Sequence, residues 1–351
     1  MSTLLRIGII SPLWKPLPPE RYGGTELVVS QLVEGLVKRG HKVIVFASGD
    51  SKTSARIVAV TEKNLYDTFG SFKWDNLEYD ILEVEKVARF SSEFDVLHNH
   101  NGFVPLVITP LIKTPMITTL HSSLSPQPES LAKAFKDRLF VSISNAQRNL
   151  APYLNYIKTV YHGIDIERFP FSHTSGDYLL FLGTFSPYKG PDIAIRIARE
   201  LKIPIVLTGE IRKEFEDFYR DEIASKEDGK DVIIKGEINF EEKVELLKNA
   251  MALLMPVRWQ EAFGLVMIEA MACGTPVIGF NRGAIPEIIE DGKTGFVVNS
   301  VEKAEEAVLK IHKIDRTYCR KMVNERFSLK RMVDEYESLY KELIVREHRA
   351  K

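Results

Sequence analysis

The stretch Met251-Ala-Leu-Leu-Met-Pro-Val-Arg-Trp-Gln-Glu261-Ala-Phe-Gly264-Leu-Val-Met-Ile-Glu269-Ala-Met-Ala-Cys-Gly274-Thr-Pro276 decides the fold. Its first seven residues are apolar and predict a buried strand over residues 251–257. From Leu265 to Ala272 apolar residues recur at helical spacing, and Gly274-Thr-Pro276 predicts the end of that helix. The stretch therefore predicts a strand, then a turn that contains Glu261, then a helix.

The predicted turn combines an anion site with two carboxylates. Phe263-Gly264 precedes the helix, so backbone N–H groups without helical partners favour a phosphate there, and Gly264 lets a ligand approach the backbone closely. Glu261 lies just before this site, and Glu269 lies about two turns beyond it. A phosphate does not call for carboxylates, but sugar hydroxyls do, because carboxylates are strong hydrogen-bond acceptors. The combination predicts a nucleotide sugar, which carries both a phosphate and a polyol.

Each carboxylate taken alone also has an ordinary explanation. Glu261 would be a helix-capping acid and Glu269 a solvated helix residue, and for either residue alone this explanation is the better one. The pair is harder to explain in this way, because Glu269 lies in the apolar run Met267 to Met271. A lone carboxylate in such a helix is costly unless another group pairs with it.

The region from Glu261 onward resembles the signature of the retaining glycosyltransferases of family 4. Two glutamates are separated by seven residues and followed by Ala270-Met-Ala-Cys-Gly-Thr-Pro-Val-Ile-Gly279. Gly283-Ala-Ile-Pro-Glu-Ile-Ile289 and Asp291-Gly-Lys-Thr-Gly-Phe296 resemble the same family, and the resemblance is collinear from about residue 6 to about residue 340. It implies the α/β fold called GT-B, in which two Rossmann-like domains face each other across a cleft and the C-terminal helix crosses back to the first domain.

Length and composition agree with two domains. A chain of 351 residues can build two cores, and 44% apolar with 27% charged residues is typical of globular proteins. The stretch between Asp165 and Asp177 has no periodicity, so we place the domain boundary there. The resemblance then assigns residues 1–165 to acceptor binding, 166–325 to donor binding, and 326–351 to a helix that packs back on the first domain.

Charge and cysteine content disfavour several classes of protein. A net charge of −1 gives no global attraction to nucleic acid or membrane, and two cysteines cannot form a disulfide framework, so a cytoplasmic location is expected. No apolar run reaches the roughly 18 residues of a membrane span, and residues 1–6 lead into a strand without a signal-peptide pattern. Few glutamines beside many lysines and glutamates point weakly to a thermophile.

The predicted first strand, Leu4 to Ile10, precedes a proline-rich loop that ends in Gly23-Gly24. The Gly-x-Gly-x-x-Gly pattern of dinucleotide sites is missing after this strand, which disfavours nicotinamide and flavin enzymes, and we expect no cofactor. The next helix is predicted from Leu27 to Arg39, with Thr25 as its cap. The two glycines are either a flexible loop tip or backbone that approaches a ligand. The resemblance favours the second and places them near the donor phosphates and the acceptor.

Histidines stand at the ends of three later predicted strands, over residues 95–98, 115–121 and 157–162. Ligands bind at the carboxyl ends of such strands, but a single histidine there is more often structural. His98 and His100 do not predict a metal site, because no nearby cysteine or acid supplies a third ligand. By resemblance, His121 lies beside the donor sugar and His162 is a hinge residue. The acceptor residues expected on the same basis are Thr25, His98 and His100.

The second domain is predicted to begin with a strand from Tyr178 to Gly183. Lys189 follows, and although a lone lysine is usually solvated, this one matches the phosphate-binding Lys-Gly of the family. Thr184 stands where the family usually has an arginine, five residues before that lysine. Either the activity is lower, or another cation such as Arg258 or Arg21 compensates, and a non-catalytic function stays open.

Further donor contacts are expected at strand ends and turns. Strands predicted over 204–209 and 231–236 flank a charged stretch, 211–230, which we expect to be solvated. Gly236 to Lys243 resembles the segment that holds the nucleoside base through its backbone, and nothing in it separates uracil from guanine. The complete expected donor set is Gly23, Gly24, Gly183, Thr184, Lys189, Gly209, Ile238, Glu261, Phe263, Gly264, Leu265, Val266 and Glu269.

The predicted reaction moves a hexose from a UDP- or GDP-sugar, such as UDP-glucose or GDP-mannose, to a hydroxyl acceptor with retention of configuration. The acceptor is a glycan, a lipid carrier or a small molecule. No metal-ligand set is visible, so Lys189, the helix start at Gly264 and the Gly23-Gly24 amides must stabilise the leaving diphosphate. By resemblance, His121, Glu261 and Lys189 are the catalytic residues.

Two alternatives stay open. One is a phosphorylase or trehalose-synthase-like enzyme on the same fold, and the other is a non-catalytic nucleotide-sugar-binding subunit, which Thr184 favours. Basic and aromatic side chains over residues 135–156 predict either a weak peripheral contact with the inner membrane face or, more often, an ordinary sheet-covering helix and strand.

Overall fold

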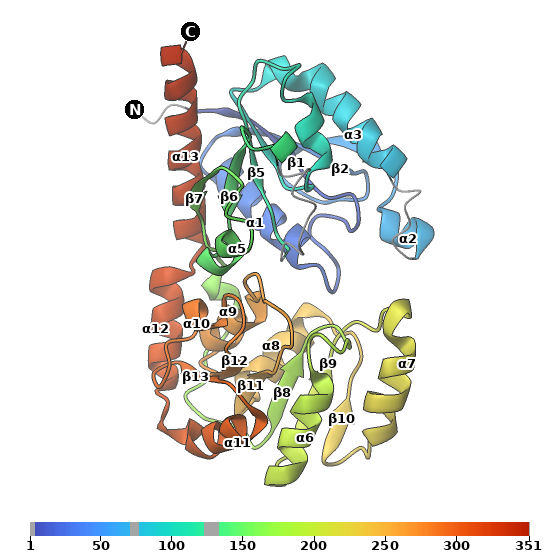
Figure 1. Ribbon diagram of the computed structural model, residues 1–351, viewed down its shortest axis with the longest axis vertical. Helices are drawn as coiled ribbons and strands as arrows, with labels where there is room; N and C mark the ends of the chain where they lie inside the picture. Colours follow the sequence, from blue (N-terminus) through green and yellow to red (C-terminus); the bar gives the residue numbers. More distant parts are fainter. Residues whose placement is uncertain (1–3, 71–76, 123–132, 351) are drawn as a thin grey trace. The chain divides into compact units, whose positions relative to one another are not determined.

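The computed structural model describes residues 4–70, 77–122 and 133–350 (Figure 1). The chain forms two compact units, which we call the N-terminal unit (Met1–Gly163 with Leu329–Lys351) and the C-terminal unit (Ile164–Ser328). The chain leaves and re-enters the N-terminal unit at one place, where Ile164 pairs with Ser328 and its N–H donates to the Phe327 carbonyl at 2.9 Å. The divisions thus fall at 163/164 and 328/329, where the sequence suggested 165/166 and 325/326.

The N-terminal unit is built on a seven-stranded parallel sheet with the order β3-β2-β1-β4-β5-β6-β7. Short apolar strands buried on both faces favour this arrangement, since parallel strands need crossover connections that cover the sheet. The order reverses between β1 and β4, and the carboxyl ends on either side of such a reversal form a ligand-binding edge. The strands are β1 Arg6–Ile10, β2 Lys42–Ser48, β3 Arg56–Thr61, β4 Val96–Asn99, β5 Met116–Thr119, β6 Leu139–Ser142 and β7 Tyr156–Thr159.

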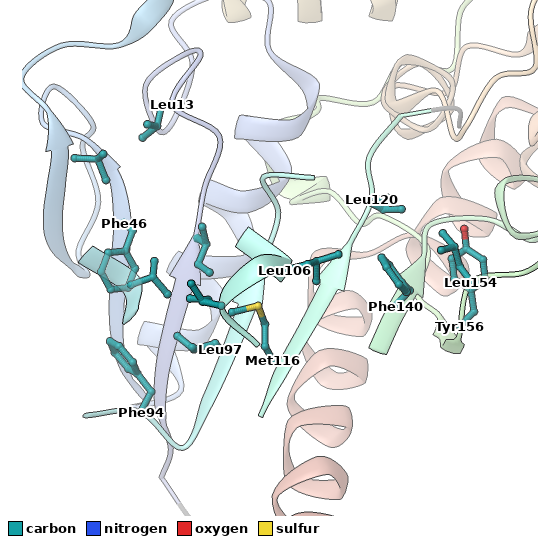
Figure 2. Packing of buried hydrophobic residues seen from close by; sticks show 14 of the residues in the cluster. Leu13, Phe46, Phe94, Leu97, Leu106, Met116, Leu120, Phe140, Leu154 and Tyr156 are labelled. Atoms are coloured by element: carbon teal, nitrogen blue, oxygen red, sulfur yellow. The ribbon is translucent and has the colours of Figure 1, made fainter. Parts of the chain in front are cut away.

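Buried apolar side chains from these strands and their helices form one core cluster (Figure 2). Phe46 from β2, Leu97 from β4 and Phe140 from β6 are fully buried in it. The helices of the unit are α1 Gly24–Lys38, α2 Leu65–Phe69, α3 Leu77–Phe90, α5 Asn145–Leu150 and α13 Leu329–Ala350, with short turns η2 Ser91–Glu93 and η3 Val104–Ile108.

Helix α1 begins three residues earlier than the sequence suggested, so the cap assigned to Thr25 is wrong. Gly23 is the N-cap, and no side chain caps the helix. Thr25 already lies in the first turn, where its backbone is helical. A side chain at Gly23 would clash with its neighbour, since a Cβ there would lie 2.7 Å from Pro19 Cβ.

The last helix, α13, packs on α1 within the N-terminal unit (Figure 1). Arg39, at the end of α1, forms ion pairs with Asp334 and Glu337 of α13 at 2.5 and 2.6 Å. Close approach of the helices requires Gly35, because a Cβ there would lie 2.6 Å from Val333 Cγ2. The chain's last helix is therefore part of the N-terminal unit although the C-terminal unit precedes it in sequence.

Residues 135–156 contribute mainly to the core of this unit and to the layer that covers its sheet. They form β6, α5 and the first residue of β7, and Phe140 is fully buried. Arg148 lies over the Tyr156 ring at 5.8 Å from its centroid. Tyr153 is 39% exposed, so one of the aromatic side chains considered for a membrane patch faces solvent.

The C-terminal unit is built on a six-stranded parallel sheet with the order β10-β9-β8-β11-β12-β13. Its strands are β8 Leu179–Leu182, β9 Ile205–Thr208, β10 Val232–Ile234, β11 Ala252–Met255, β12 Val277–Phe280 and β13 Gly295–Val298. The main helices are α6 Pro191–Leu201, α8 Phe240–Asn249, α9 Leu265–Ala272, α10 Ile285–Ile288, α11 Val301–Lys310 and α12 Arg316–Arg326. The crossovers through α6 and α9 leave neighbouring strands in opposite directions, so right-handed connections put these two helices on opposite faces of the sheet.

The charged stretch 211–230 is mostly exposed, as expected, but some of its side chains pack on the unit. It contains the short helix α7 Glu216–Phe218 and a π turn over Tyr219–Ile223. Tyr219 contacts the Phe185 ring at 5.2 Å between centroids, and Ile223 is fully buried. This segment therefore covers the loop that follows β8.

Among the residues that the structure describes, no helix has both the length and the apolar composition needed to cross a bilayer.

Candidate functional site

The topology of the C-terminal unit explains why Lys189 and Glu261 meet. Their loops follow β8 and β11, which are neighbours in the sheet and whose helices α6 and α9 leave toward opposite faces. This is the point of an open parallel sheet at which ligands bind beyond the carboxyl ends of the strands. Residues 72 positions apart in sequence are thus brought into direct contact.

Glu261 lies in the predicted strand-to-helix turn and is held there by its own backbone. Its carbonyl accepts a hydrogen bond from the Ala284 N–H at 2.8 Å. Gly283 has a left-handed φ of 59°, and a Cβ there would lie 2.1 Å from the Glu261 carbonyl oxygen. The turn that begins the Gly-Ala-Ile-Pro sequence therefore fixes the position of the loop that carries Glu261, which we call the Glu261 loop, a role that the sequence did not reveal.

The Glu261 carboxylate takes part in a cluster of three side chains, which we call the Glu261 triad. Lys189 Nζ lies 2.6 Å from Glu261 Oε2, and the Trp259 indole N–H donates to the same oxygen at 3.1 Å. Lys189 Nζ also lies 4.6 Å from the Trp259 ring centroid, within cation–π range. Sequence reasoning predicted Lys189 and Glu261 but missed Trp259, although it lies within the quoted stretch.

Helix α9 begins at Leu265, directly after Gly264, as the sequence predicted. Gly264 is the N-cap with a left-handed φ of 84°, and no side chain caps the helix. The first N–H groups of an α-helix have no partners within the helix, so Leu265 and Val266 present backbone donors at this end. Phe263, which precedes them, is buried. The geometry is that of an anion site beside the Glu261 triad.

Glu269, on the same helix, is paired with a lysine that sequence reasoning missed. It is buried, and Lys243 Nζ lies 2.7 Å from Glu269 Oε1. An Asn239–Glu242 capping box fixes the start of α8 and so places Lys243 in its first turn. The predicted cost of a lone carboxylate in an apolar helix is therefore avoided by an ion pair across helices. Ile238, expected near the base, is half-buried in the turn before α8.

Thr184 is buried after β8, and Arg258, one of the two cations suggested in its place, is bound to an aspartate. The Arg258 guanidinium binds both carboxylate oxygens of Asp192, at 2.8 and 2.5 Å, and also the Pro187 carbonyl. Arg21 belongs to the N-terminal unit. Arg258 thus stabilises the loop that carries Lys189. Its guanidinium is engaged by Asp192 and Pro187 and is not free to bind a phosphate.

The ends of β8 and β9 touch where the sequence placed Gly183 and Gly209. A Cβ at Gly209 would lie 1.7 Å from the Gly183 carbonyl oxygen, so a larger residue does not fit. Beyond Gly209, the Glu210 carbonyl accepts the Phe185 N–H at 2.9 Å, and the buried Glu210 carboxylate pairs with Arg212 at 2.8 Å. The sequence did not predict this ion pair between Glu210 and Arg212.

The N-terminal unit gathers four histidines at the carboxyl ends of β4, β5 and β7, and we call them the histidine cluster. Its members are His98, His100, His121 and His162, all of which are buried or nearly so. His98 lies at the end of β4, whereas His121 and His162 follow the ends of β5 and β7, because those two strands are shorter than predicted. Parallel strands bring these positions to one edge of the sheet.

The histidine cluster is linked by hydrogen bonds and ring contacts. His98 Nδ1 and Nε2 lie 2.7 Å from Tyr340 Oη and 2.8 Å from Thr119 Oγ1, respectively. His100 Nδ1 lies 2.8 Å from His121 Nε2, and His121 stacks on His162 with 5.2 Å between centroids. Burial lowers the pKa of the His98, His100 and His162 imidazoles well below 6.5 and that of His121 to about 3. All four rings are therefore neutral near pH 7 and act as hydrogen-bonding groups, not as cations.

The placement of the predicted residues divides them between the two units. The structure brings Lys189, Glu261, Phe263 and Gly264 together in the C-terminal unit, with Glu269 further along α9. Gly23 and the exposed Gly24 lie at the start of α1, Thr25 follows them, and the histidine cluster lies in the same N-terminal unit. Among the described residues, no group of three or more histidine, cysteine, aspartate or glutamate side chains is arranged to hold a metal ion.

Comparison with known proteins agrees with this division. The profile of the family described as Glycosyl transferases group 1 matches residues 164–325, and that of Glycosyltransferase Family 4 matches residues 22–168. O-antigen chain mannosyltransferase C of Escherichia coli is 24% identical over 95% of this chain and 98% of its own length.

Two solved structures are similar throughout the chain. Sucrose-phosphate synthase of Thermosynechococcus elongatus has a TM-score of 0.79 at 18% identity and covers 97% of this chain and 99% of its own. HepE of Anabaena in complex with UDP-glucose has a TM-score of 0.72 at 17% identity and covers 95% of this chain and 99% of its own. The two parallel α/β units and these similarities define a GT-B fold. The chain belongs to the family 4 glycosyltransferases, and the activity of this class is the transfer of a sugar.

Proposed function

We propose that this protein transfers a hexose from a UDP- or GDP-sugar to a hydroxyl acceptor, with retention of configuration and without a metal ion. The observation that carries the proposal is the contact between Lys189 and Glu261 at 2.6 Å beside the uncapped start of α9. This arrangement supplies a cation and helix N–H groups for a diphosphate and a carboxylate for sugar hydroxyls.

In this proposal the leaving diphosphate is stabilised by fixed donors. Lys189 and the first N–H groups of α9 would face its negative charge, and donors aimed at developing charge stabilise a transition state strongly. Glu261 would accept hydrogen bonds from the sugar hydroxyls, and Glu269 from the ribose hydroxyls. In the wild-type protein each carboxylate already has a lysine partner: Lys189 pairs with Glu261, and Lys243 pairs with Glu269.

The N-terminal unit would contribute His121 to the donor sugar and Thr25, His98 and His100 to the acceptor. Because His121 is neutral, it would orient a sugar hydroxyl through a hydrogen bond and would not supply a positive charge. His98 already uses both ring nitrogens within the protein, so it would support the neighbouring acceptor residues more than it would contact the acceptor directly. Gly23 and Gly24 would offer backbone N–H groups to the diphosphate.

The names of similar proteins support the substrate class. The Escherichia coli relative is a mannosyltransferase that acts on O-antigen chains, and the Anabaena structure contains UDP-glucose. A nucleotide sugar is therefore the proposed donor. The hydroxyl of a glycan, a lipid carrier or a small molecule is the proposed acceptor, at a cytoplasmic location with at most a peripheral membrane contact.

A thermal-shift panel of UDP-, GDP- and ADP-sugars tests the proposal. We expect one nucleotide class to stabilise the wild-type protein and Glu269→Ala to lose that stabilisation. Glu325→Ala, which removes an exposed glutamate of α12, is the matched control and should respond as the wild type does. A donor shift that survives in Glu269→Ala would contradict the ribose role of that carboxylate.

The buried Thr184 gives the non-catalytic alternative a specific basis. A binding subunit would be stabilised by the donor but would neither transfer nor slowly hydrolyse it. Robust turnover with phosphate and a glycoside alone would instead identify a phosphorylase. Stabilisation by a nucleotide sugar together with slow release of its sugar would support the transferase and exclude both alternatives.

A further inference from the structure

We propose that Trp259 is a positioning residue of the donor site, which holds Glu261 through its indole N–H and Lys189 through its ring face. The inference rests on the proposed function, because it concerns how the same site would distinguish a nucleotide sugar from a nucleoside diphosphate. One side chain would thus set the position of the group that contacts the sugar and of the group that contacts the diphosphate.

The geometry of the Glu261 triad is the basis of this inference. Lys189 Nζ and Trp259 Nε1 both bind Glu261 Oε2, at 2.6 and 3.1 Å. Within the described part of the chain these are the two hydrogen bonds of the Glu261 carboxylate. Because both partners bind Oε2, the Glu261 Oε1 atom keeps its acceptor capacity for a ligand hydroxyl.

A glutamate side chain with one partner can rotate about its terminal bonds, whereas two donors on one oxygen define the direction of the carboxylate. The Glu261 side chain is 7% exposed, so its hydrogen bonds are shielded from competition by water. Trp259 therefore restricts an almost buried carboxylate to one orientation, with Oε1 turned away from both partners.

The Trp259 contact restrains Lys189 for a different reason. Its ammonium is a compact charge on a flexible stem, and 19% of the side chain is exposed. The Trp259 ring face, 4.6 Å away, attracts the ammonium without forming a hydrogen bond with it. The ring therefore restrains Lys189 without using an N–H donor of its ammonium.

Trp259 is only half-buried, and within the described residues its hydrogen bond and its cation–π contact both go to members of the triad. No other aromatic ring among those residues is paired with it. A role confined to packing would not require the indole N–H to point at the Glu261 carboxylate. The two contacts can also be removed one at a time, which makes the proposal testable.

Two variants separate the contacts. Trp259→Phe keeps an aromatic face for Lys189 but removes the N–H donor, and Trp259→Leu removes both. Tyr318→Phe is the matched control, because it removes an aromatic O–H that donates to a glutamate, Glu290, at 2.8 Å outside the triad. Thermal melting of each variant establishes that it is folded.

Isothermal titration calorimetry with the preferred nucleotide sugar and with its nucleoside diphosphate provides the readout. We expect Trp259→Phe to bind the nucleotide sugar about tenfold more weakly, as for loss of a charge-assisted hydrogen bond, and the nucleoside diphosphate as the wild type does. Trp259→Leu should weaken the binding of both ligands, and Tyr318→Phe should weaken neither.

Equal affinities of wild type and Trp259→Phe for the nucleotide sugar would overturn the proposal. Equal losses for both ligands in a folded Trp259→Phe would overturn it too, since a general structural role would then suffice. If the wild-type protein itself binds no nucleotide sugar, the proposed function fails first, and this result is distinguishable from a failure that concerns Trp259 alone.

Discussion

Replacing Lys243 by methionine tests whether the ion pair with Glu269 supports the C-terminal unit. The substitution keeps most of the side-chain volume but leaves a buried carboxylate without its cation, 2.7 Å from where Nζ had been. Loss of one partner of a buried pair costs about 3–5 kcal/mol, and we expect about 3 kcal/mol because 18% of the Lys243 side chain is exposed. For a unit of this size that corresponds to a fall in Tm of about 6–12 °C.

The matched control is on the same helix. Lys248→Met breaks the pair with Glu245, whose carboxylate side chain is 62% exposed, and should change the free energy of unfolding by less than about 1 kcal/mol. The double variant Lys243→Met with Glu269→Met should recover most of the lost stability, because an apolar pair replaces a buried charge. Differential scanning calorimetry of all variants gives the comparison. The reasoning is refuted if Lys243→Met melts like Lys248→Met, or if the double variant is no more stable than the single one.

Three further predictions concern the histidine cluster at acid pH, the buried Glu83 carboxyl and the Glu261 loop. Burial holds the pKa values of the histidine cluster below that of unfolded histidine. The stability that these neutral rings contribute is therefore complete above about pH 6.5 and is lost as the pH falls. For His121 the loss is about 1.4 kcal/mol per pH unit. His162→Asn should therefore reduce the acid dependence of Tm, and the exposed His312→Gln should not. Glu83 is fully buried and its pKa is raised, so the stability it contributes is complete below about pH 4.5 and is lost as the pH rises above that value, and Glu83→Gln should melt like the wild type near pH 4 and better at pH 7. Gly283→Ala should abolish donor binding and lower Tm, since its Cβ would meet the Glu261 backbone at 2.1 Å.

Each of these predictions has a result that contradicts it. An unchanged Tm between pH 8 and pH 5 would contradict the buried neutral state of the histidine cluster. A Glu83→Gln variant that melts no better than the wild type at pH 7 would exclude that carboxyl as the cause. Full donor binding in Gly283→Ala would show that the Glu261 loop does not depend on this close approach.

Local patterns predicted the elements that carry the proposed donor site. The apolar run 251–257 contains β11, and helix α9 begins directly after Gly264, because a buried strand and a glycine N-cap depend on residues that are close in sequence. The same reasoning placed the histidines near the ends of β4, β5 and β7. The same reasoning did not predict the start of α1. Both glycines of the pair were assigned to a loop, whereas Gly24 is already the first residue of the helix.

The partners of the predicted residues could not be read from the sequence. Lys243 meets Glu269 because α8 and α9 pack together, and nothing in the local pattern of α8 distinguishes Lys243 from solvated lysines such as Lys248. Trp259 lies within the stretch that predicted the site, but its contact with Lys189 depends on the position of another loop, which the sequence does not give. Arg258 was suggested as a cation that compensates for Thr184 on the basis of its charge alone. In the structure its guanidinium binds Asp192. Tertiary packing decides such pairs, and the sequence supplies only the candidates.

The central claim is that Lys189, Glu261 and the start of α9 catalyse sugar transfer from a nucleotide sugar with retention of configuration. Time-resolved proton NMR of the first product formed from the donor that stabilises the wild type tests it most directly, with Glu261→Gln in parallel. We predict that an α-linked donor gives an α-linked product and that the variant, although folded, forms this product at least about a hundredfold more slowly. A β-linked first product, or an unchanged rate in Glu261→Gln, would contradict the claim.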